Sequence, residues 1–224
     1  MQAAAAVSDL WDDEGHRISQ LLFGEAFDLL DRQGDRVWGQ SRRDGVVGWT
    51  AASALIEAGG TPSHRVASMG GALPFNALVD PARDAVGDSA LAPLGEFEPG
   101  LADVAERLLG TPHALGGRSD RETDCAGLVQ TCLIACGRAA PRWSDGQAEI
   151  GRAVGLADMR RGDLVVWPHS TGGPGWSGHS AVIASPGALI HASGRAGSVV
   201  IEALSDVDAR QRAEGFGAPI FRRV

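Results

Sequence analysis

One cysteine and two histidines stand in contexts that suit nucleophilic catalysis. Cys125 opens an apolar run that reads Asp-Cys-Ala-Gly-Leu-Val, and His179 and His191 follow it, each inside a short run of apolar residues. A cysteine nucleophile needs an imidazole that takes its proton and a further group that orients the imidazole. The three residues therefore predict a thiol nucleophile with its base and its orienting group.

The position of Cys125 at the start of a predicted helix suggests how the thiol is activated. A free cysteine is mostly protonated at neutral pH, and the thiolate is the attacking species. The backbone amides and the positive dipole end of a helix N-terminus favour the anion, and the same amides could bind an oxyanion. We therefore expect Cys125 to be held ionised beside an imidazole.

Residue spacing predicts the elements that position these side chains. A helix follows Asp124 and ends before Gly137, and an amphipathic helix precedes it at residues 101–109. On a strand, alternate residues share a face, so His179 points the same way as Ala181. Since adjacent strands lie about 4.8 Å apart, the rings of His179 and His191 can touch if their strands are neighbours.

The order of the predicted elements favours an α+β fold in which a helix packs on an antiparallel sheet. After the helix that starts at Cys125, a short helix is expected from Ser144 to Ala153. The strands expected after it are 164–167, 179–184, 188–191 and 198–203.

The N-terminal part of the chain predicts a small β-barrel. Apolar and β-branched runs at 17–23, 26–30, 36–40 and 46–50 alternate with polar and glycine turns. We expect Trp38 and Trp49 to be core or rim residues of this barrel. The expected domains are a barrel at 1–60, a linker or degenerate second barrel at 61–98, and a catalytic domain at 99–224.

Composition excludes several function classes. The net charge is −8 with no basic block, so nucleic acid is not an expected partner. No apolar run approaches the roughly 20 residues that span a bilayer, and residues 1–10 lack the features of a secretory signal, so we expect a cytoplasmic protein without membrane contact. The three cysteines leave at least one free thiol, as expected in a reducing compartment.

A metal site or a cofactor is not expected. Cys132 and Cys136 fall on the apolar faces of the predicted helix and are explained by packing. With Cys125 they give the spacing C-x6-C-x3-C, which matches no compact zinc chelate. Three further histidines lack supporting context and are left unassigned, namely His16, His64 and His169.

Four ordered blocks of the chain resemble the NlpC/P60 family of cell-wall peptidases. The blocks are Asp-Cys-Ala-Gly-Leu-Val at 124–129, Arg-Gly-Asp-Leu-Val-Val-Trp at 161–167, Gly-His-Ser-Ala-Val-Ile at 178–183 and Leu-Ile-His-Ala at 189–192. The resemblance covers residues 100–224, and the preceding region resembles a bacterial SH3-like domain. It implies a papain-like α+β catalytic domain preceded by an SH3-like barrel.

The resemblance also implies an activity and the role of each site residue. It implies hydrolysis of γ-D-glutamyl amide bonds in peptidoglycan stem peptides, with Cys125 as nucleophile, His179 as base and His191 as the orienting residue. In relatives with SH3-like domains and no export signal, the substrate is a freed peptide with an unblocked L-alanine end. Asp124 is then expected to meet its ammonium group. The other expected substrate-binding residues are His113, Ala126 and Ser180.

Two departures from the family pattern leave other functions open. Ala126 stands where the family usually has serine, and His113 and Leu115 stand where it usually has tyrosine and tryptophan in Thr-Pro-Tyr-x-Trp-Gly-Gly. His113 could replace the tyrosine as a donor, or the change could alter specificity or slow the enzyme. The alternatives to a peptidase are an inactive protein that binds peptidoglycan peptides and an acyltransferase on the same fold.

Overall fold

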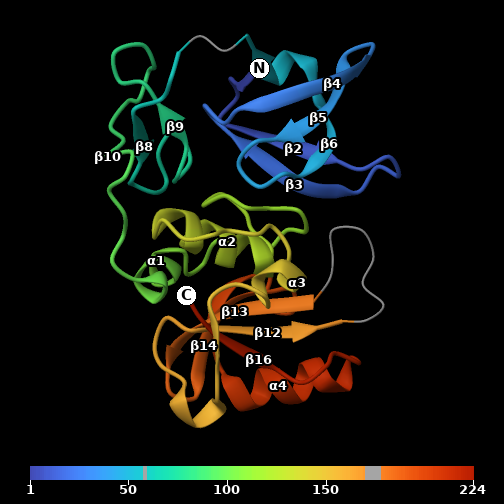
Figure 1. Cartoon of the computed structure of the whole chain (residues 1–224), viewed down its shortest axis with the longest axis vertical. Coiled ribbons are helices and arrows are strands. Elements are labelled where there is room, and N and C mark those ends of the chain that lie inside the picture. The colour runs from blue at the N-terminus through green and yellow to red at the C-terminus, as the bar shows by residue number, and fades with distance from the viewer. Residues whose placement is uncertain (58–59, 170–177) are drawn as a thin grey trace. The chain divides into compact units, whose positions relative to one another are not determined.

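The computed structural model describes residues 1–57, 60–169 and 178–224. The chain forms two compact units (Figure 1). Unit 1 comprises residues 1–96 and 115–121, and unit 2 comprises residues 97–114 and 122–224. Among the described residues, no helix combines the length and the apolar character needed to cross a membrane.

Unit 1 contains a five-stranded antiparallel sheet with the strand order β3-β2-β6-β5-β4. Its strands are β2 (Val7–Trp11), β3 (Arg17–Leu22), β4 (Phe27–Gln33), β5 (Arg36–Ser41) and β6 (Val47–Ala51). Leu10, Leu21, Phe27 and Val37 are buried between them. The predicted SH3-like barrel is confirmed, and the hairpin turns lie at the predicted polar and glycine positions.

The first residues of the chain pair with the segment that follows β6, although sequence patterning indicated no strand before residue 17. β1 (Gln2–Ala3) pairs with β7 (Leu55–Ile56), which follows the short 3₁₀ helix η1 (Ala52–Ala54). Trp49 is 9% exposed, and its Nε1 donates to Asp13 at 2.8 Å. Its ring lies 5.3 Å from that of Trp38. Trp49 is therefore nearly buried at the barrel rim.

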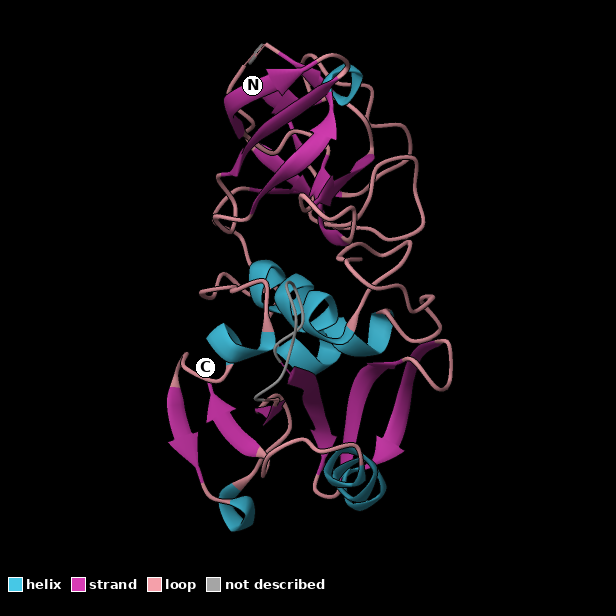
Figure 2. Cartoon of the chain, turned by 90° about the vertical axis from the view of Figure 1, so that its right-hand side faces the viewer, coloured by secondary structure: helices cyan, strands magenta, loops and turns pink. Residues whose placement is uncertain are grey.

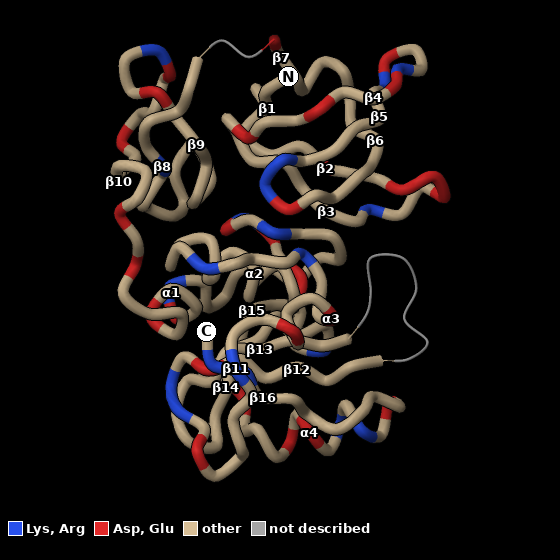
Figure 3. Tube along the Cα trace, in the orientation of Figure 1, with Lys and Arg blue, Asp and Glu red and all other residues tan. Residues whose placement is uncertain are grey.

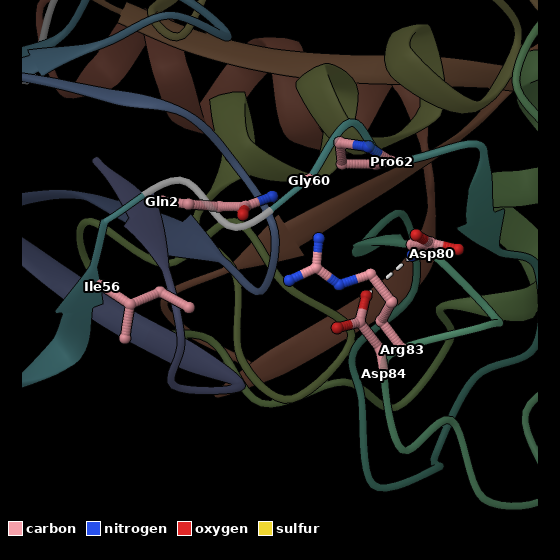
Figure 4. Close-up of a pocket in the computed structure, with 7 residues that line it drawn as sticks. All are labelled: Gln2, Ile56, Gly60, Pro62, Asp80, Arg83 and Asp84. Atoms are coloured by element: carbon pink, nitrogen blue, oxygen red, sulfur yellow. Dashed lines mark hydrogen bonds between the residues drawn. The ribbon is translucent and has the colours of Figure 1, made fainter.

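The segment after the barrel has a small sheet of its own, with the order β10-β8-β9. Its strands are β8 (His64–Val66), β9 (Leu78–Val79) and β10 (Leu91–Pro93), and Val66, Leu73, Ala77 and Val79 form its core. Within unit 1, a cavity of about 50 Å³ separates this segment from β1 and β7 (Figure 4). Its lining residues are Gln2, Ile56, Gly60, Pro62, Asp80, Arg83 and Asp84.

A buried ion pair holds residues 115–121 in unit 1. The side chains of Arg118 and Glu25 are each 1% exposed, and Nη2 of Arg118 donates to Oε2 of Glu25. Arg118 also donates through Nε to the carbonyl of Gln20 at 2.6 Å and through its backbone amide to Oε1 of Gln20 at 2.9 Å. These bonds fix a segment that ends four residues before Cys125.

Unit 2 is built on a six-stranded antiparallel sheet with the order β11-β16-β12-β13-β14-β15. The strands are β11 (Arg152–Val154), β12 (Leu164–Pro168), β13 (Gly178–Ser185), β14 (Ala188–Ser193), β15 (Ser198–Ala203) and β16 (Ile220–Arg223). The helices α1 (Leu101–Arg107), α2 (Cys125–Ala135) and α3 (Ser144–Gln147) cover one face, and α4 (Leu204–Ala213) covers the other (Figure 2). The predicted α+β class is confirmed.

Helix α2 begins and ends at the residues that the sequence indicates. The side chain of Asp124, its N-cap, accepts a hydrogen bond from the amide of Gly127 at 2.7 Å. Gly137 follows the C-cap with φ +65°, a conformation that favours glycine. Cys132 and Leu133 are fully buried in this helix, so it lies in the centre of unit 2.

Four elements of unit 2 differ from the sequence-based expectation, and one of them is β16 (Ile220–Arg223), which was not predicted. The predicted helix 144–153 ends at Gln147, and residues 152–154 form strand β11 because they pair with β16. Helix α4 was not predicted, although Leu204, Val207 and Gln211 give it a buried side at i, i+3 and i+7.

Acidic and basic residues are interspersed along the described chain without a continuous basic segment (Figure 3).

Replacing Arg118 by methionine should destabilise unit 1. The substitution removes one partner of a buried ion pair and leaves the carboxylate of Glu25 with less positive charge to balance it. The free energy of unfolding should therefore fall by on the order of 3 kcal/mol. Urea unfolding followed by tryptophan fluorescence measures the change. The matched control is Arg42→Met, which breaks the exposed pair of Arg42 with Asp28 and should change the free energy of unfolding little. Equal effects of the two variants would contradict a buried anchor.

Candidate active site

Cys125 is the first residue of α2, and its sulfur faces the start of strand β13. Sγ lies 3.9 Å from the carbonyl oxygen of Gly178, and it is also hydrogen-bonded by the backbone of Ser180 and Ala126. Gly178 and Ser180 flank His179 in the chain. Cys125 and His179 are both half-buried, so the site is accessible from solvent. The structure thus places the thiol beside the strand segment that carries the predicted base.

Glycine is required at position 178 for this approach. A Cβ added there would lie 2.5 Å from the carbonyl oxygen of Trp167 on β12 and 3.2 Å from Cβ of Ser144. Such contacts would force the start of β13 to move. The close packing of β12, α3 and β13 therefore depends on a residue that has no side chain.

The N-cap residue Asp124 is buried in an ion pair with Arg142. Nη2 of Arg142 lies 2.6 Å from Oδ2 of Asp124, and Nη1 lies 3.0 Å from Oδ1. Both side chains are less than 10% exposed. This two-point contact is strong and directional, so it fixes the turn before the nucleophile. The expected contact of Asp124 with a substrate ammonium remains a prediction.

The expectation that Cys125 is held ionised is wrong for the resting site. Burial and, to a smaller extent, the negative charge of Asp124 raise the pKa of the thiol from 9.0 to about 11. Backbone hydrogen bonds from Ser180 and Ala126, together with the charge of Arg142, lower the pKa but do not offset burial. The sequence could not reveal this balance, because it depends on how closely the sulfur is covered.

The two predicted histidines are in direct contact. Nε2 of His179 on β13 lies 2.7 Å from Nδ1 of His191 on β14, and the ring planes are nearly perpendicular at 89°. His179 also packs against Trp167, with ring centroids 5.8 Å apart. His191 is 1% exposed. The prediction that the two rings touch from adjacent strands is confirmed.

Two further residues extend this contact and were missed in the sequence. Nε2 of His191 lies 2.6 Å from Oε2 of Glu202, the second-to-last residue of β15. The same oxygen accepts from Nη2 of Arg210 on α4 at 2.7 Å. Alternation along β15 gave no signal for Glu202, because its importance arises from the pairing of β15 with β14. We call His179, His191 and Glu202 the histidine relay.

Burial keeps both histidines of the relay neutral. Burial lowers the pKa of His179 well below its usual range, and the charges of His191, Arg210 and His113 lower it further. Burial also lowers the pKa of His191, although the hydrogen bond and charge of Glu202 oppose this effect. The pKa of Glu202 is lowered, since the hydrogen bonds from His191 and Arg210 outweigh its burial. The resting site therefore combines a protonated thiol, neutral imidazoles and a carboxylate.

His113 lies beside the relay, as its predicted role requires. Its backbone pairs with Thr123, two residues before the nucleophile, and its amide donates to the carbonyl of Gly197 at 2.9 Å. A Cβ added at Gly194 would lie 3.6 Å from its ring. Its charge also influences the pKa values of His179 and His191. His113 is thus placed at the site, and contact with substrate remains a prediction.

The side chains of Ser180 and Ala126 are buried under the site. Ser180 is fully buried, and its hydroxyl donates to Oγ of Ser144 at 2.8 Å. Ala126 is 5% exposed, and its carbonyl accepts from Nε2 of Gln147 at 2.9 Å. Any contact of these two residues with substrate must therefore come mainly from their backbone amides. Their predicted role in substrate binding stays a prediction.

The described residues offer little for a metal ion at this site. Cys125, Cys132 and Cys136 are free thiols, and the latter two are buried along α2. Within the described ranges, Asp12, Glu14 and His16 bring ligand atoms within 4.8 Å of one another. These three residues lie in unit 1, and their ring and carboxylates pair with each other. They form no part of the relay.

Comparisons with known proteins agree with the fold of both parts of the chain. Residues 110–216 match the NlpC/P60 family, and residues 12–55 match the bacterial dipeptidyl-peptidase SH3 domain. A probable endopeptidase of Corynebacterium glutamicum is 30% identical over 97 residues, which cover 43% of this chain and 46% of the relative. The gamma-D-glutamyl-L-lysine dipeptidyl-peptidase of Bacillus subtilis is 32% identical over 98 residues, which cover 44% of this chain and 33% of the relative. The chain thus spans less than half of the length of these two curated relatives.

A solved structure with a similar fold aligns with nearly the whole chain. The crystal structure of an NlpC/P60 family protein from Bacillus cereus ATCC 10987 aligns with a TM-score of 0.73 and 18% sequence identity, covering 99% of this chain and 98% of that one. At this identity the likeness supports the fold alone. The two family matches show that the chain carries a bacterial SH3 domain at residues 12–55, followed by an NlpC/P60 domain at residues 110–216.

Proposed function

We propose that the protein is a cysteine peptidase that hydrolyses γ-D-glutamyl amide bonds in peptidoglycan stem peptides. The observation that carries the proposal is the thiol of Cys125 beside the strand that bears His179, whose ring is bonded to the buried His191. The names of the relatives support the substrate class, since two of them, from Bacillus subtilis and Bacillus cereus, are gamma-D-glutamyl-L-lysine dipeptidyl-peptidases.

The proposed reaction begins with proton transfer at the moment of attack. Nε2 of His179 is bonded to His191, so Nδ1 is the nitrogen that takes the proton of the Cys125 thiol. The sulfur then attacks the scissile carbonyl carbon, and the backbone amides at the start of α2 stabilise the negative oxygen. Because the thiol pKa is raised and the imidazole pKa is lowered, thiol and neutral imidazole form the resting pair.

The second half of the reaction restores the free thiol. His179, now an imidazolium, gives its proton to the leaving amine as the C–N bond breaks, and a thioester on Cys125 remains. His179 then removes a proton from a water molecule, which attacks the thioester carbon. The C–S bond breaks, the sulfur recovers the proton from His179, and the acid product leaves. The amine leaves with the proton that Cys125 lost, and the thiol regains a proton from the water molecule, so the reaction balances without a cofactor.

The proposed substrate is a freed peptide with an unblocked L-alanine end. Asp124 is the acidic group expected to meet its ammonium, and its carboxylate is already held in place by Arg142. His113 is proposed to donate a hydrogen bond to substrate or to the oxyanion, in place of the tyrosine usual in the family. Its backbone contact with Thr123 keeps it beside the nucleophile.

Incubation with L-alanyl-γ-D-glutamyl-diaminopimelate and mass detection tests the proposed activity. The wild type should release the L-alanyl-γ-D-glutamate dipeptide, and Cys125→Ala should abolish release because the nucleophile is gone. Cys132→Ala is the matched control and should retain activity, since that thiol is fully buried in α2. Retention of intact peptide by the wild type would instead support a binding protein, and product joined to an added amine would support an acyltransferase.

Alkylation by iodoacetamide tests the ionisation state of the thiols. Cys125 should react faster than Cys132 and Cys136, because it is half-buried and the others are buried. With a thiol pKa of about 11, its rate should rise about tenfold per pH unit from neutral pH upward. Peptide mapping after labelling measures both quantities. A rate plateau near neutral pH would show a preformed thiolate and contradict the resting pair described above.

Substitution of His113 tests its proposed role as a donor. His113→Phe should lower kcat/KM for the peptide by about tenfold or more, because an oxyanion or substrate atom loses a hydrogen bond. His113→Tyr supplies a hydroxyl donor and should retain more activity than the phenylalanine variant. Steady-state kinetics measures the difference, and far-ultraviolet circular dichroism checks the fold. Full activity of His113→Phe would remove His113 from the proposed site.

A further inference from the structure

The outer end of the histidine relay carries a carboxylate and a guanidinium that the proposed reaction does not require as reactants. We propose that Glu202 and Arg210 are positioning residues that together set the direction of the hydrogen bonds through His191, so that His179 faces Cys125 as a base. The kinetic part of this inference rests on the proposed function.

Three elements bring the groups of this outer end together. His191 lies on β14, Glu202 on β15 and Arg210 on α4. Oε2 of Glu202 is 2.6 Å from Nε2 of His191 and 2.7 Å from Nη2 of Arg210, and Oε1 is 3.4 Å from Nη1. One carboxylate oxygen thus accepts two hydrogen bonds, and the second oxygen keeps the guanidinium aligned.

The carboxylate fixes the direction of every bond in the relay. An ionised carboxylate can only accept, so Nε2 of His191 must carry the proton. A neutral imidazole has one donor and one acceptor, and Nδ1 of His191 is therefore an acceptor. Nε2 of His179 must then donate to it, which leaves the lone pair of His179 on Nδ1. The direction set at Glu202 reaches the active nitrogen through two rings.

The opposite direction would give an inactive site. If Nδ1 of His191 carried a proton, it would donate to Nε2 of His179, and the proton of a neutral His179 would move to Nδ1. That nitrogen could not then remove a proton from Cys125. Protonation of His191 to the imidazolium has the same result, because both of its nitrogens become donors. The site therefore needs His191 both neutral and oriented.

Arg210 counteracts the effect of the Glu202 charge on the protonation of His191. A carboxylate alone beside an imidazole favours the imidazolium, which is the inactive form of His191. The titratable and charged groups facing His191 are His179 from β13, Glu202 from β15, Arg210 from α4 and His113 from the segment before α2. Of these, Arg210 opposes the charge of Glu202 directly. The pair thus supplies an acceptor to His191 with little net charge.

Solvent reaches this end of the relay through an open pocket of about 600 Å³. Its lining residues are Ser193, Arg195, Ala196, Glu202, Asp206 and Arg210. The side chain of Glu202 is 28% exposed, so water could otherwise compete for its oxygens. The contact from Arg210 keeps Oε2 directed at His191 in the presence of this water.

The pH dependence of kcat/KM for the tripeptide separates positioning from a structural role. Glu202→Gln removes the charge at constant size, and it should lower the plateau by roughly 10- to 100-fold and shift the acid limb to lower pH. Arg210→Met removes the opposing charge and should shift the acid limb to higher pH, with activity lost mainly on the acid side. Loss of packing alone would not move the two limbs in opposite directions. Shifts in the same direction, or no shift, would overturn the inference.

Conservative variants and controls complete the kinetic test. Glu202→Asp keeps a carboxylate and should recover part of the activity lost in Glu202→Gln. Glu214→Gln and Arg212→Met are matched controls, because both side chains are exposed near the end of α4 and outside the relay. Both should leave the plateau and the acid limb unchanged. An equal loss in Glu202→Asp and Glu202→Gln would contradict the role of the carboxylate.

Nitrogen-15 NMR of the histidine rings tests the inference without any substrate. At neutral pH the wild type should show protonated Nε2 and unprotonated Nδ1 in both His179 and His191. The pKa of His191 should fall in Glu202→Gln and rise in Arg210→Met. A proton on Nδ1 of His191 in the wild type would overturn the inference. Since these spectra need no turnover, they remain decisive if the peptide is not cleaved and the proposed function fails.

Discussion

The hydrogen bond between His179 and His191 is the interaction on which the site depends. The bond joins Nε2 of His179 and Nδ1 of His191 over 2.7 Å, between rings on adjacent strands. The residue His191 is almost fully buried. Each neutral imidazole has one donor and one acceptor nitrogen, so two bonded rings form a chain that has a direction. Strand alternation places both rings on the face of the sheet that α4 covers, where Leu189 and Ile183 pack against Leu204. Helix α4 therefore lies on the same side of the sheet as the two rings.

Burial shapes the acid–base chemistry of the site more strongly than the helix terminus does. The amide of Ala126 and the charge of Arg142 favour a thiolate, yet burial and the charge of Asp124 keep the pKa of Cys125 raised. Burial also lowers the pKa of His179. Both effects disfavour the charged form, so they favour a neutral pair at rest. In the proposed reaction, charge separates only when the substrate carbonyl can share it.

The chain just before the nucleophile is held at several points. Arg118 is fixed by Glu25 and Gln20 within unit 1, and Asp124 is fixed by Arg142 within unit 2. A buried ion pair contributes little net stability but is costly to break, so such pairs restrict a segment to one conformation. The turn that leads into α2 is thereby constrained on both sides of Thr123, whose backbone pairs with the His113 segment.

The sequence by itself determined the local elements and the chemical types of the site. Alternation and glycine turns predicted the strands of His179 and His191, and Asp124 and Gly137 marked the ends of α2, because these signals depend on neighbouring residues in the chain. Helix α4 and strand β16 were missed because their buried residues are few and depend on the sheet. Only the tertiary structure decided that Glu202 and Arg210 join His191 and that Cys125 is un-ionised at rest. Strand pairing and burial set both outcomes, and neither is encoded in local spacing.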